Sequence, residues 1–408
     1  MARVIFVNRY FYPDQSATSR VLTDLAFGLA AAGHSVHVIT SRQLIEDASA
    51  GLEAQASING VQVHRVWTTR FGRGKLKARA FDYLSFHWSA RAKVAAIAGP
   101  GDVVVAKTDP PLLSISLEGV TRSRGARLVT WLQDLFPEVA TALGVLDAQG
   151  FAAQKLTKWR DRSLRAAAMN VVLGEAMARV VRSHDVLPER VKIIPNWSDG
   201  ARIGVRGEGA RAMRQEWGLE DAFVVGYCGN LGRVHEFNTL LEMATQLSDD
   251  PRVHFVFVGS GAQAGPLMDG VKSRHLTRVH LFPAEPEERL SALLGAMDVH
   301  AVVLAPALEG FVVPSKLYGV LAAGRPVLNI GAQGAEISEL VEEYRCGFGI
   351  VAGDATLGAQ RVRELVSTVG LCEELGDNAR QLFEARYDRN TAVEHWSSLL
   401  DEVSCDGR

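Results

Sequence analysis

The fold class of this chain is decided by the stretch RVIFVNRYFYPDQSATSRVLTDLAFGLAAAGHSVHVIT, residues 3–40. A short apolar run stands at each end of this stretch, and a segment of helical period lies between the two runs. Nearly continuous apolar strands separated by amphipathic helices are typical of parallel sheets that helices cover on both faces. We therefore predict a βαβ unit whose helix ends at Gly33, a C′ glycine.

The same alternation of short β-branched runs and longer Ala- and Leu-rich segments continues along the chain. It pauses at a segment rich in turn residues, 195–209, and then restarts. The strand candidates are residues 3–8, 35–40, 61–66, 102–107, 127–132, 169–174 and 191–195 before this segment, and 223–229, 253–259, 278–282, 299–306, 326–331 and 348–351 after it. The pattern predicts an α/β protein with two Rossmann-like, doubly wound parallel-sheet domains.

The domain boundaries follow from the point at which the alternation of strand and helix segments restarts. We predict a first domain over residues 1–198, a second over 199–385, and a C-terminal helix within 386–408 that packs back on the first domain. Two domains suit a chain of 408 residues, because a single core rarely grows beyond about 250–300 residues. Ligands of open α/β sheets bind beyond the carboxyl ends of the strands, so we expect the site in a cleft between two facing domains.

Composition and charge narrow the class of protein. With 47% hydrophobic and 22% charged residues, the chain has the composition of a soluble globular protein. Residues 1–200 hold 25 Lys and Arg against 17 Asp and Glu, a net charge of +8, whereas residues 201–408 hold 19 against 29, a net charge of −10. We therefore expect the basic half to face an anionic partner.

The cysteines and the N-terminal residues bear on the compartment. The four cysteines show neither a CxxC pair nor the spacing of a disulfide framework, which favours a reducing compartment. The apolar run before Asn8 is too short for a signal peptide, and no uncharged stretch reaches the roughly 20 residues of a membrane span. We predict a cytoplasmic protein without a membrane span.

One glycine motif points weakly to a dinucleotide. In VGSGAQAG, residues 258–265, Gly259, Gly261 and Ala264 approximate the dinucleotide-binding fingerprint. The motif follows the second strand of its domain instead of the first, and no acid stands cleanly after the next strand to hold a ribose. We therefore interpret it as a glycine turn between a strand and a helix, and we expect no NAD.

The stretch EGFVVPSKLYGVLAAGRP, residues 309–326, combines an acid, glycines and a lysine at the start of a helix. Here Glu309 would accept hydrogen bonds from sugar hydroxyls, and Gly310 and Phe311 would offer backbone amides. Ser315 and Lys316 would contact phosphate oxygens, because a lysine beside a helix N-terminus can stabilise a departing diphosphate. The alternative is structural, with Lys316 solvated and Glu309 capping a helix.

A similar loop opens the second domain at YCGNLGRVHEF, residues 227–237. Arg233 could grip a diphosphate with its fixed fork of donors, and His235 could add a hydrogen bond. The alternative for Arg233 is a solvated side chain on a loop.

Two loops of the first domain also follow strands. Ser16, Ala17 and Thr18 stand at a helix start, where the backbone N–H groups suit a phosphate. An ordinary N-cap by Ser16 or Thr18 is the alternative. Gln133 and Asp134 follow another strand, where an acid could bind an acceptor hydroxyl or assist proton transfer. A helix N-cap is the rival interpretation of Asp134.

Most of these residues lie in or beside segments that carry a family resemblance. The chain resembles the family-4 retaining glycosyltransferases of the GT-B fold, in particular the bacterial branch that builds O-antigen, capsule and exopolysaccharide repeat units. The resemblance spans nearly the full length, in family order. Its segments are NRYFYPDQSATSRVLTDLAFGLAAAGHSVHVITSR, WLQDLFPEVATALGVL, IIPNWSD, YCGNLGR, FVGSG and PSKLYGVLAAGRPVL.

The resemblance implies where the substrates bind. A nucleotide-diphosphate sugar would sit on the second domain, and the acceptor would enter from the first. The implied donor-binding residues are Asn230, Gly232, His235, Gly259, Phe282, Gly310, Phe311, Ser315 and Tyr318. Residues Ser16, Ala17, Thr18 and Gln133 form the implied acceptor and phosphate loops, and the implied catalytic residues are Lys316, Arg233, Glu309 and Asp134.

The chain departs from the family pattern at four positions. Asn230 and His235 stand where the family usually has Arg and Lys, so Arg233 and Lys316 would share the diphosphate. Gly319 stands where relatives often have the glutamate that holds the ribose. Another group or a water would then replace that acid, or activity would be low. Gln133 stands where a histidine is common.

The expected mechanism uses no cofactor and no metal. No Asp-x-Asp motif, which holds Mn²⁺ or Mg²⁺ in the other major glycosyltransferase fold, occurs in the sequence. Leaving-group stabilisation by Arg233, Lys316 and helix termini is therefore expected. The resemblance implies front-face attack by the acceptor hydroxyl with retention at the anomeric carbon. The departing diphosphate oxygen could itself take the proton.

Two basic segments suggest a membrane surface. Residues 70–94 interleave basic and aromatic residues, and residues 154–165 form a second basic helix. Such segments can lie on an anionic membrane. We predict a peripheral protein at the inner face of the plasma membrane, with the surface in Arg70–Lys93 and Lys155–Arg165 and a polyprenyl-diphosphate-linked acceptor. A solvated face with its aromatics in the core is the alternative, and nucleic acid is not expected because no binding module is recognisable.

Two other functions remain compatible with the sequence. A sugar-nucleotide 2-epimerase shares the two-domain architecture and would need neither an acceptor nor a membrane face. A non-catalytic sugar-nucleotide-binding partner of a polysaccharide assembly complex would suit the glycine at position 319.

Overall fold

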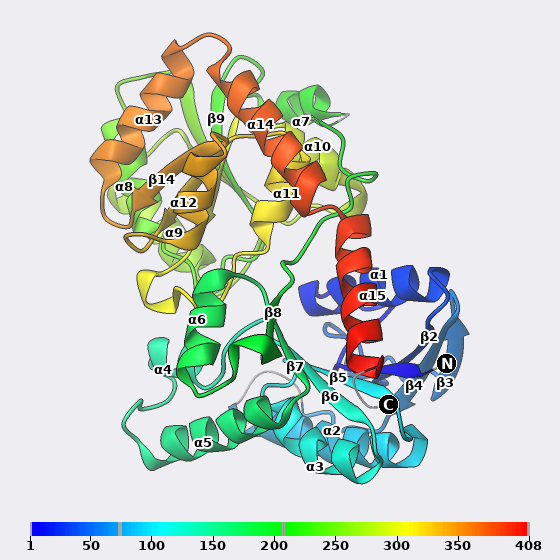
Figure 1. The fold of residues 1–408 in the computed structure, drawn as a ribbon. Coiled ribbons are helices and arrows are strands. Elements are labelled where there is room, and N and C mark those ends of the chain that lie inside the picture. The colour runs from blue at the N-terminus through cyan, green and yellow to red at the C-terminus, as the bar shows by residue number, and fades with distance from the viewer. Residues whose placement is uncertain (1, 72–75, 206, 208, 406–408) are drawn as a thin grey trace. The chain divides into compact units, whose positions relative to one another are not determined.

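The structure, a computed structural model, divides into two compact units. The described residues are 2–71, 76–205, 207 and 209–405. Unit 1 comprises the residues up to Pro195, Gly310–Val313 and the residues from Arg389 onward, and unit 2 comprises Asn196–Glu309 and Pro314–Asp388. Each unit places one largely parallel sheet between layers of helices (Figure 1). The predicted fold class of two parallel-sheet α/β domains is confirmed.

The sheet of unit 1 has the strand order β3-β4-β2-β1-β5-β6-β7-β8. Its strands are β1 (Arg3–Val7), β2 (Ser35–Ser41), β3 (Gln55–Ile58), β4 (Val61–Val66), β5 (Val103–Lys107), β6 (Arg127–Trp131), β7 (Met169–Val172) and β8 (Val191–Ile193). Neighbouring strands pair in parallel, except for the edge strand β3, which pairs antiparallel with β4. The strand order reverses between β1 and β5, because β1 pairs with β2 on one side and with β5 on the other.

Helices cover both faces of this sheet. They are α1 (Ala17–Ala31), α2 (Leu76–Ile97), α3 (Leu113–Ser123), α4 (Glu138–Ala142), α5 (Phe151–Ala166), α6 (Glu175–Ser183) and α15 (Arg389–Cys405). Helix α3 packs between α2 and α5 on one face, whereas α1 and α15 pack together on the other (Figure 1). The predicted end of the first helix is confirmed: α1 ends at Ala31, and Gly33 adopts a φ of +92°.

Helix α15 brings the C-terminal residues into the core of unit 1. The ring of Trp396 is fully buried and lies 4.7 Å, centroid to centroid, from the ring of Trp131 on β6. Gly28 of α1 allows this packing, because a Cβ at that position would lie 2.6 Å from a methyl of Val393. The guanidinium of Arg127 donates a hydrogen bond to the carbonyl of Val403 over 2.6 Å.

The sheet of unit 2 has the order β11-β10-β9-β12-β13-β14 and is parallel throughout. Its strands are β9 (Phe223–Cys228), β10 (Val253–Val258), β11 (Val279–Phe282), β12 (Val299–Val303), β13 (Val327–Gly331) and β14 (Gly347–Val351). The order reverses between β9 and β12. In a doubly wound sheet, such a reversal opens a crevice at the carboxyl ends of the two strands, where ligands bind.

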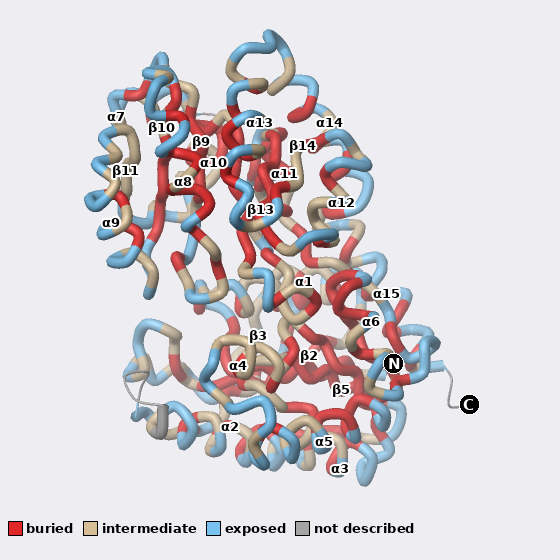
Figure 2. The backbone as a smooth tube through the Cα atoms, turned by 90° about the vertical axis from the view of Figure 1, so that its left-hand side faces the viewer, coloured by how far each residue is buried: buried red, intermediate tan, exposed pale blue. Residues whose placement is uncertain are grey.

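The helices of unit 2 pack on both faces of its sheet. They are α7 (Ala210–Trp217), α8 (Asn238–Gln246), α9 (Ala264–Ser273), α10 (Leu290–Gly295), α11 (Lys316–Ala322), α12 (Glu336–Glu343), α13 (Ala355–Ser367) and α14 (Leu371–Arg386). One core joins the sheet to α8, α9 and α13, and others join it to α11 and α14 and to α7 and α10. The strands of both sheets are therefore mostly buried, as the red segments of Figure 2 show. Among the described residues, no helix combines the length and apolar character that crossing a membrane requires.

Candidate active site

The strand reversal of unit 2 brings together two residues that lie 81 positions apart in the sequence. His235 stands on the loop after β9, and Lys316 begins α11 after the loop that follows β12. The Nζ atom of Lys316 lies 3.2 Å from Nε2 of His235 and 4.9 Å from the centroid of the Tyr227 ring. Two predicted site residues thus meet at the carboxyl edge of the second sheet.

Burial controls the electrostatics of this pair. Burial lowers the pKa of Lys316 to about 8, although the neighbouring Cys228 acts in the opposite direction. Burial and then the charge of Lys316 lower the pKa of His235 to about 3. Among the described residues, no carboxylate lies within 4.0 Å of Lys316 Nζ to form an ion pair. Lys316 is therefore a half-buried lysine with no carboxylate partner among the described residues, and an anionic ligand would pair with its ammonium form.

The other ring nitrogen of His235 is held by its own loop. Its Nδ1 atom lies 3.2 Å from both the backbone N of Gly232 and the hydroxyl of Tyr227. The Tyr227 hydroxyl in turn donates to the carbonyl of Asn230 over 2.7 Å. Gly232, Asn230 and His235, all predicted donor-binding residues, are thus joined in one hydrogen-bonded loop.

Glycines allow the neighbouring backbones to approach closely. Gly259, which follows β10, has a φ of +146° and lies so near Gly229 that a Cβ would stand 2.0 Å from the Gly229 carbonyl oxygen. Lys316 crosses Gly229, since a Cβ on that glycine would stand 2.7 Å from Lys316 Cε. Gly259 donates its N–H to the carbonyl of Phe282. The motif at residues 258–265 is therefore a glycine turn, as predicted.

The remaining predicted residues of unit 2 differ in their exposure. Arg233, Asn230 and Ser315 are exposed. The Phe282 ring stacks on that of Trp217 with a centroid separation of 5.2 Å. Tyr318 is buried in the core, 5.2 Å from the Tyr387 ring, so its side chain is not open to solvent.

Glu309 makes the helix-capping contact that was the structural alternative for this residue in the sequence analysis. Its Oε1 atom accepts a hydrogen bond from the backbone N of Glu336, the first residue of α12, over 3.1 Å. A carboxylate at this position stabilises a helix N-terminus.

Gly310 and Phe311 belong to unit 1 instead of unit 2. The carbonyl of Phe311 accepts a hydrogen bond from the backbone N of Leu135 over 2.9 Å. Gly310 has a φ of +78° and packs on α6, where a Cβ would stand 3.2 Å from a methyl of Val180. This short segment therefore lies beside the loop that carries Gln133 and Asp134.

The strand reversal of unit 1 holds a lysine that our sequence analysis missed. Lys107, the last residue of β5, is only 2% exposed. Its Nζ atom donates to the carbonyl of Thr18 and lies 4.3 Å from the centroid of the Trp131 ring. A signal was available, because a lysine at the end of the apolar strand VVVAK stands at the carboxyl edge of the sheet.

Asp134 lies near this lysine. Its Oδ1 atom is buried and has no hydrogen-bond partner among the described residues. Burial raises the pKa of the carboxyl, while a hydrogen bond from Thr108 and the charge of Lys107 act to lower it. A cavity of about 20 Å³, lined in part by Lys107, Thr108 and Asp134, has room for one water molecule. The N-cap of α4 is Pro137, so Asp134 does not cap that helix.

The predicted phosphate loop already carries an acid. Oδ1 of the buried Asp14 accepts hydrogen bonds from the backbone N and the hydroxyl of Ser16. The Ser16 side chain makes no capping hydrogen bond to α1. Ala17 is exposed, whereas Thr18 accepts the hydrogen bond from Lys107 through its carbonyl.

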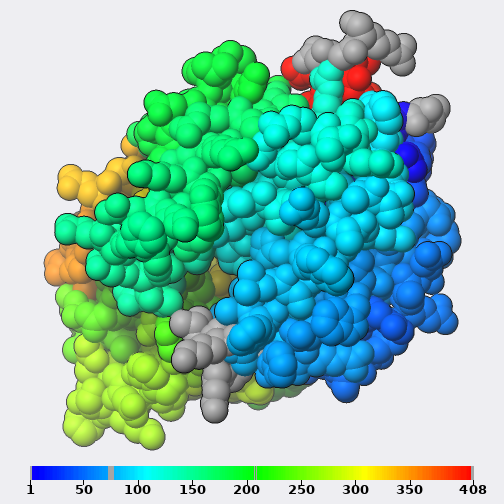
Figure 3. Space-filling model, turned by 90° about the horizontal axis from the view of Figure 1, so that it is seen from below, coloured from blue at the N-terminus to red at the C-terminus, as the bar shows by residue number. Residues whose placement is uncertain are grey.

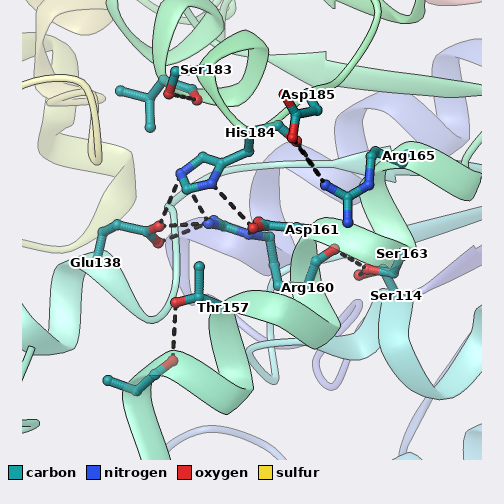
Figure 4. A network of polar contacts seen from close by, with 12 residues as sticks. Ser114, Glu138, Thr157, Arg160, Asp161, Ser163, Arg165, Ser183, His184 and Asp185 are labelled. Carbon is teal, nitrogen blue, oxygen red and sulfur yellow. Dashed lines mark hydrogen bonds and ion pairs between the residues drawn. The ribbon is translucent and has the colours of Figure 1, made fainter. Parts of the chain in front are cut away.

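A buried ionic network fixes the segment after Asp134 (Figure 4). Arg160 of α5, 3% exposed, binds both carboxylate oxygens of Glu138 and also Asp161. His184 completes the network through Asp161, with Nδ1 3.1 Å from Oδ2. The network joins α4, α5 and α6, so the loop carrying Gln133 and Asp134 leads into a fixed helix.

Family models match this chain along both units. The model described as the glycosyl transferase 4-like domain matches residues 16–197, and the model described as glycosyl transferases group 1 matches residues 210–382. The chain belongs to the family-4 glycosyltransferases. The predicted family and its GT-B fold are thereby confirmed.

Several known proteins resemble this family-4 glycosyltransferase. The probable glycosyltransferase WbjE of Pseudomonas aeruginosa is 27% identical over 81% of this chain and 82% of its own length. The putative colanic acid biosynthesis glycosyl transferase WcaI of Escherichia coli (strain K12) is 29% identical over 54% of this chain and 55% of its own length. The structure of Anabaena HepE in complex with UDP superposes with a TM-score of 0.73 at 17% identity, covering 98% of this chain and 100% of HepE.

Proposed function

We propose that this family-4 glycosyltransferase moves a sugar from a nucleotide-diphosphate sugar to a lipid-linked saccharide, with retention of configuration, in the assembly of a surface polysaccharide. The observation that carries the proposal is Lys316, which is half-buried beside His235 at the strand reversal of unit 2 and has no carboxylate partner among the described residues. The HepE structure, which has the same fold, contains bound UDP. WcaI is named for colanic acid biosynthesis. Both names support a nucleotide-sugar substrate and a polysaccharide product.

Unit 2 would bind the donor through its diphosphate. Lys316 would supply a point charge to the departing oxygen, and the exposed Arg233 could add a second cation from the loop after β9. Charge that develops on a leaving diphosphate is stabilised best by groups already held in place and shielded from water. Lys316 is held in place, because its carbon chain lies across Gly229 and its Nζ contacts His235, and it is partly shielded from water.

Unit 1 would present the acceptor. Asp134 and Lys107 lie at the carboxyl edge of its sheet, where an acceptor hydroxyl could bind. In front-face attack, the acceptor oxygen bonds to the anomeric carbon as the bond to the diphosphate oxygen breaks, and that oxygen takes the hydroxyl proton. Asp134 would then orient the hydroxyl without having to remove its proton.

Helices α2, α3 and α5 pack side by side on one face of unit 1, which Figure 3 shows from below. The side chains of this face suit an anionic membrane. Its exposed apolar side chains include Phe71, Phe81, Leu84, Trp88, Phe151 and Trp159. Exposed basic residues accompany them: Arg70, Arg79, Arg91, Lys155, Lys158, Arg162 and Arg165. Apolar side chains among cations favour the interface of an anionic bilayer.

Not every residue of the two basic segments contributes to this face. Phe86 lies in the core, and Arg160 belongs to the buried ionic network. The predicted positions Arg73 and Lys75 lie outside the described residues. The surface that would meet a lipid-linked acceptor is thus smaller than the sequence pattern suggested.

A transfer assay tests the proposed function. Purified protein is incubated with a panel of radiolabelled nucleotide sugars and a bacterial membrane lipid extract, with and without EDTA. We expect label to move to the lipid fraction in both conditions, and NMR of the product to show the anomeric configuration of the donor. An epimerised donor, or binding without turnover, would contradict transfer. Inverted configuration would contradict retention alone.

A further inference from the structure

The contacts of His235 constrain where its proton can lie. The backbone N–H of Gly232 can only donate a hydrogen bond, so its 3.2 Å contact with Nδ1 requires a lone pair on that nitrogen. The single proton of a neutral imidazole must then lie on Nε2, which faces Lys316 Nζ at 3.2 Å. That contact is a hydrogen bond only if Nζ is a neutral amine that accepts.

A charged Lys316 requires the opposite arrangement. An ammonium donates to Nε2, so the ring proton must move to Nδ1. The Tyr227 hydroxyl, 3.2 Å from Nδ1, can accept it, because that hydroxyl gives its own proton to Asn230. The N–H of Gly232 then faces a donor and loses its acceptor. The two states differ by one proton: a proton binds Nδ1, the Nε2–H bond breaks, and the proton released from Nε2 bonds to Nζ.

The surroundings of Nζ do not neutralise the ammonium. Strand β9 presents Tyr227 and Cys228, whose pKa values burial raises, so both stay neutral at physiological pH. The loop after β9 presents His235, and among the described residues no acid lies within ion-pair distance of Nζ. An anion that enters the site would favour the ammonium state and would find the N–H of Gly232 available as a donor.

We propose that this site takes up one proton together with a nucleoside diphosphate: Lys316 becomes an ammonium, His235 changes tautomer, and the released N–H of Gly232 donates to the ligand. The inference rests on the proposed function, since it assumes a diphosphate ligand. It makes His235 more than a hydrogen-bonding replacement for the lysine that the family usually has. Histidine can relay a proton between its two nitrogens, which a lysine cannot.

Calorimetry on the full chain tests the proposal. UDP, GDP, ADP and dTDP are titrated at pH 8.5 in two buffers with different enthalpies of ionisation. At this pH the terminal phosphate is ionised, because its second pKa is about 6, so the ligand brings no proton. We expect uptake approaching one proton per bound nucleotide. We also expect the affinity to fall about tenfold per pH unit above pH 8, where the empty site begins to lose its proton.

A matched variant identifies the group that takes the proton. Arginine stays charged at all of these pH values, so Lys316→Arg should bind without proton uptake and with an affinity that does not change between pH 8 and 10. Lys272→Arg, at an exposed position of α9, should behave like the wild type. The ¹⁵N chemical shifts of the His235 ring nitrogens in the wild type should exchange their protonated and unprotonated values on binding.

Three results would overturn the inference. The first is wild-type binding without proton uptake, the second is equal uptake by Lys316→Arg, and the third is a His235 tautomer that ligand leaves unchanged. The first and third use the wild-type protein, so they decide the matter even if the variant fails to fold. Failure of all four diphosphates to bind would overturn the proposed function itself.

Discussion

The ammonium nitrogen of Lys107 donates a hydrogen bond to the carbonyl oxygen of Thr18 over 2.6 Å. This contact ties the last residue of β5 to the first turn of α1, across the point where the strand order of unit 1 reverses. Burial lowers the pKa of Lys107 to about 7, although Asp109 and Asp134 act against this effect. A buried lysine without an ion pair costs stability, so we expect Lys107 to have a functional role in the proposed acceptor-binding region of unit 1.

Replacing Lys107 by methionine should reduce activity without reducing stability. Between pH 7 and pH 10.5 the unfolded chain binds a proton at this lysine that the folded chain does not bind, so Lys107 makes the free energy of unfolding rise with pH in this window. Lys107→Met should weaken that rise and raise the free energy of unfolding at pH 7 by on the order of 1 kcal/mol. Urea denaturation at pH 7, 8.5 and 10 measures both the rise with pH and the free energy of unfolding at pH 7. The exposed Lys192→Met is the control, and a uniform loss of stability at all three pH values would argue against this account.

Removing the charge of Lys316 should slow turnover. In the proposed mechanism, Lys316→Ala would leave the departing diphosphate without this cation, and the loss of one such preorganised group typically costs about 10²- to 10³-fold in kcat. Steady-state kinetics with the donor found in the transfer assay measure this loss, and circular dichroism checks that the variant is folded. Lys272→Ala, which removes an exposed lysine of the same unit, should leave kcat unchanged. Near-normal turnover by Lys316→Ala would remove Lys316 from the mechanism.

Membrane binding should depend on exposed apolar side chains of α2. Leu84 and Trp88 are 64% and 70% exposed. Replacing both by serine should reduce binding to anionic vesicles about tenfold or more, because each side chain gains about 1.5–3 kcal/mol when it is buried. Vesicle cosedimentation at low and high salt measures the binding, which should weaken as salt screens the basic residues. Val369→Ser, an exposed apolar residue of unit 2, is the control. Equal binding to neutral vesicles at every salt concentration would speak against this surface.

Two stacked histidine pairs should make the fold sensitive to acid. His37 and His64 stack in unit 1, and His254 and His280 stack in unit 2, each pair with ring nitrogens 3.0 Å apart. Burial lowers the pKa of all four, that of His64 to about 4. The folded state thus favours the neutral rings. The contribution of these histidines to the free energy of unfolding is therefore fully present above pH 6.5 and is lost as the pH falls from 6.5 towards 4.

The Tm measured between pH 7 and pH 4.5 reports this acid sensitivity. His64→Gln should flatten the decline, since the unfolded chain then gains one proton fewer. His395→Gln, at an exposed position of α15, should leave the profile of the wild type unchanged. A profile that His64→Gln leaves as steep as that of the wild type would show that other groups cause the decline.

Restoring the family glutamate at position 319 should strengthen nucleotide binding. A Cβ at Gly319 would lie 3.5 Å from Leu294 Cδ1, an ordinary contact, so the backbone accepts a side chain there. If the acid reaches the ribose, its hydrogen bonds should tighten nucleotide binding about tenfold or more, which calorimetry measures. Gly226→Ala provides the contrast, because its Cβ would lie 1.9 Å from Met297 Sδ and should destabilise the protein. An unchanged nucleotide affinity in a folded Gly319→Glu variant would show that another group already holds the ribose.

Local patterns in the sequence predicted most of the fold. Strands such as β1 and β10 are short, nearly continuous apolar runs, and helix α1 ends where Gly33 predicts. The edge strand β3 was missed, because its sequence QASI is only four residues long and alternates polar and apolar residues instead of being continuously apolar. An edge strand needs only one partner and one covered face, so its residues carry a weaker signal.

The candidate site was predicted only in part. The glycine loops that place Gly259 beside Gly229 are local turns with a clear sequence signal. The sequence shows that Lys107 ends an apolar strand, but it gives no comparable signal that the side chain is buried or that Gly310 and Phe311 belong to unit 1. Each depends on contacts with residues far away in the sequence, such as Thr18 and Leu135.

The sequence by itself determined the two doubly wound sheets and the family, because strand and helix periods, turn glycines and family motifs are properties of neighbouring residues. Only the tertiary structure decided which charges are buried and what they contact. It placed Lys316 against His235, Lys107 over Trp131 and Arg160 between Glu138 and Asp161. The physical reason is that burial and the resulting pKa shifts depend on all the atoms that surround a group, and most of those atoms come from distant parts of the chain.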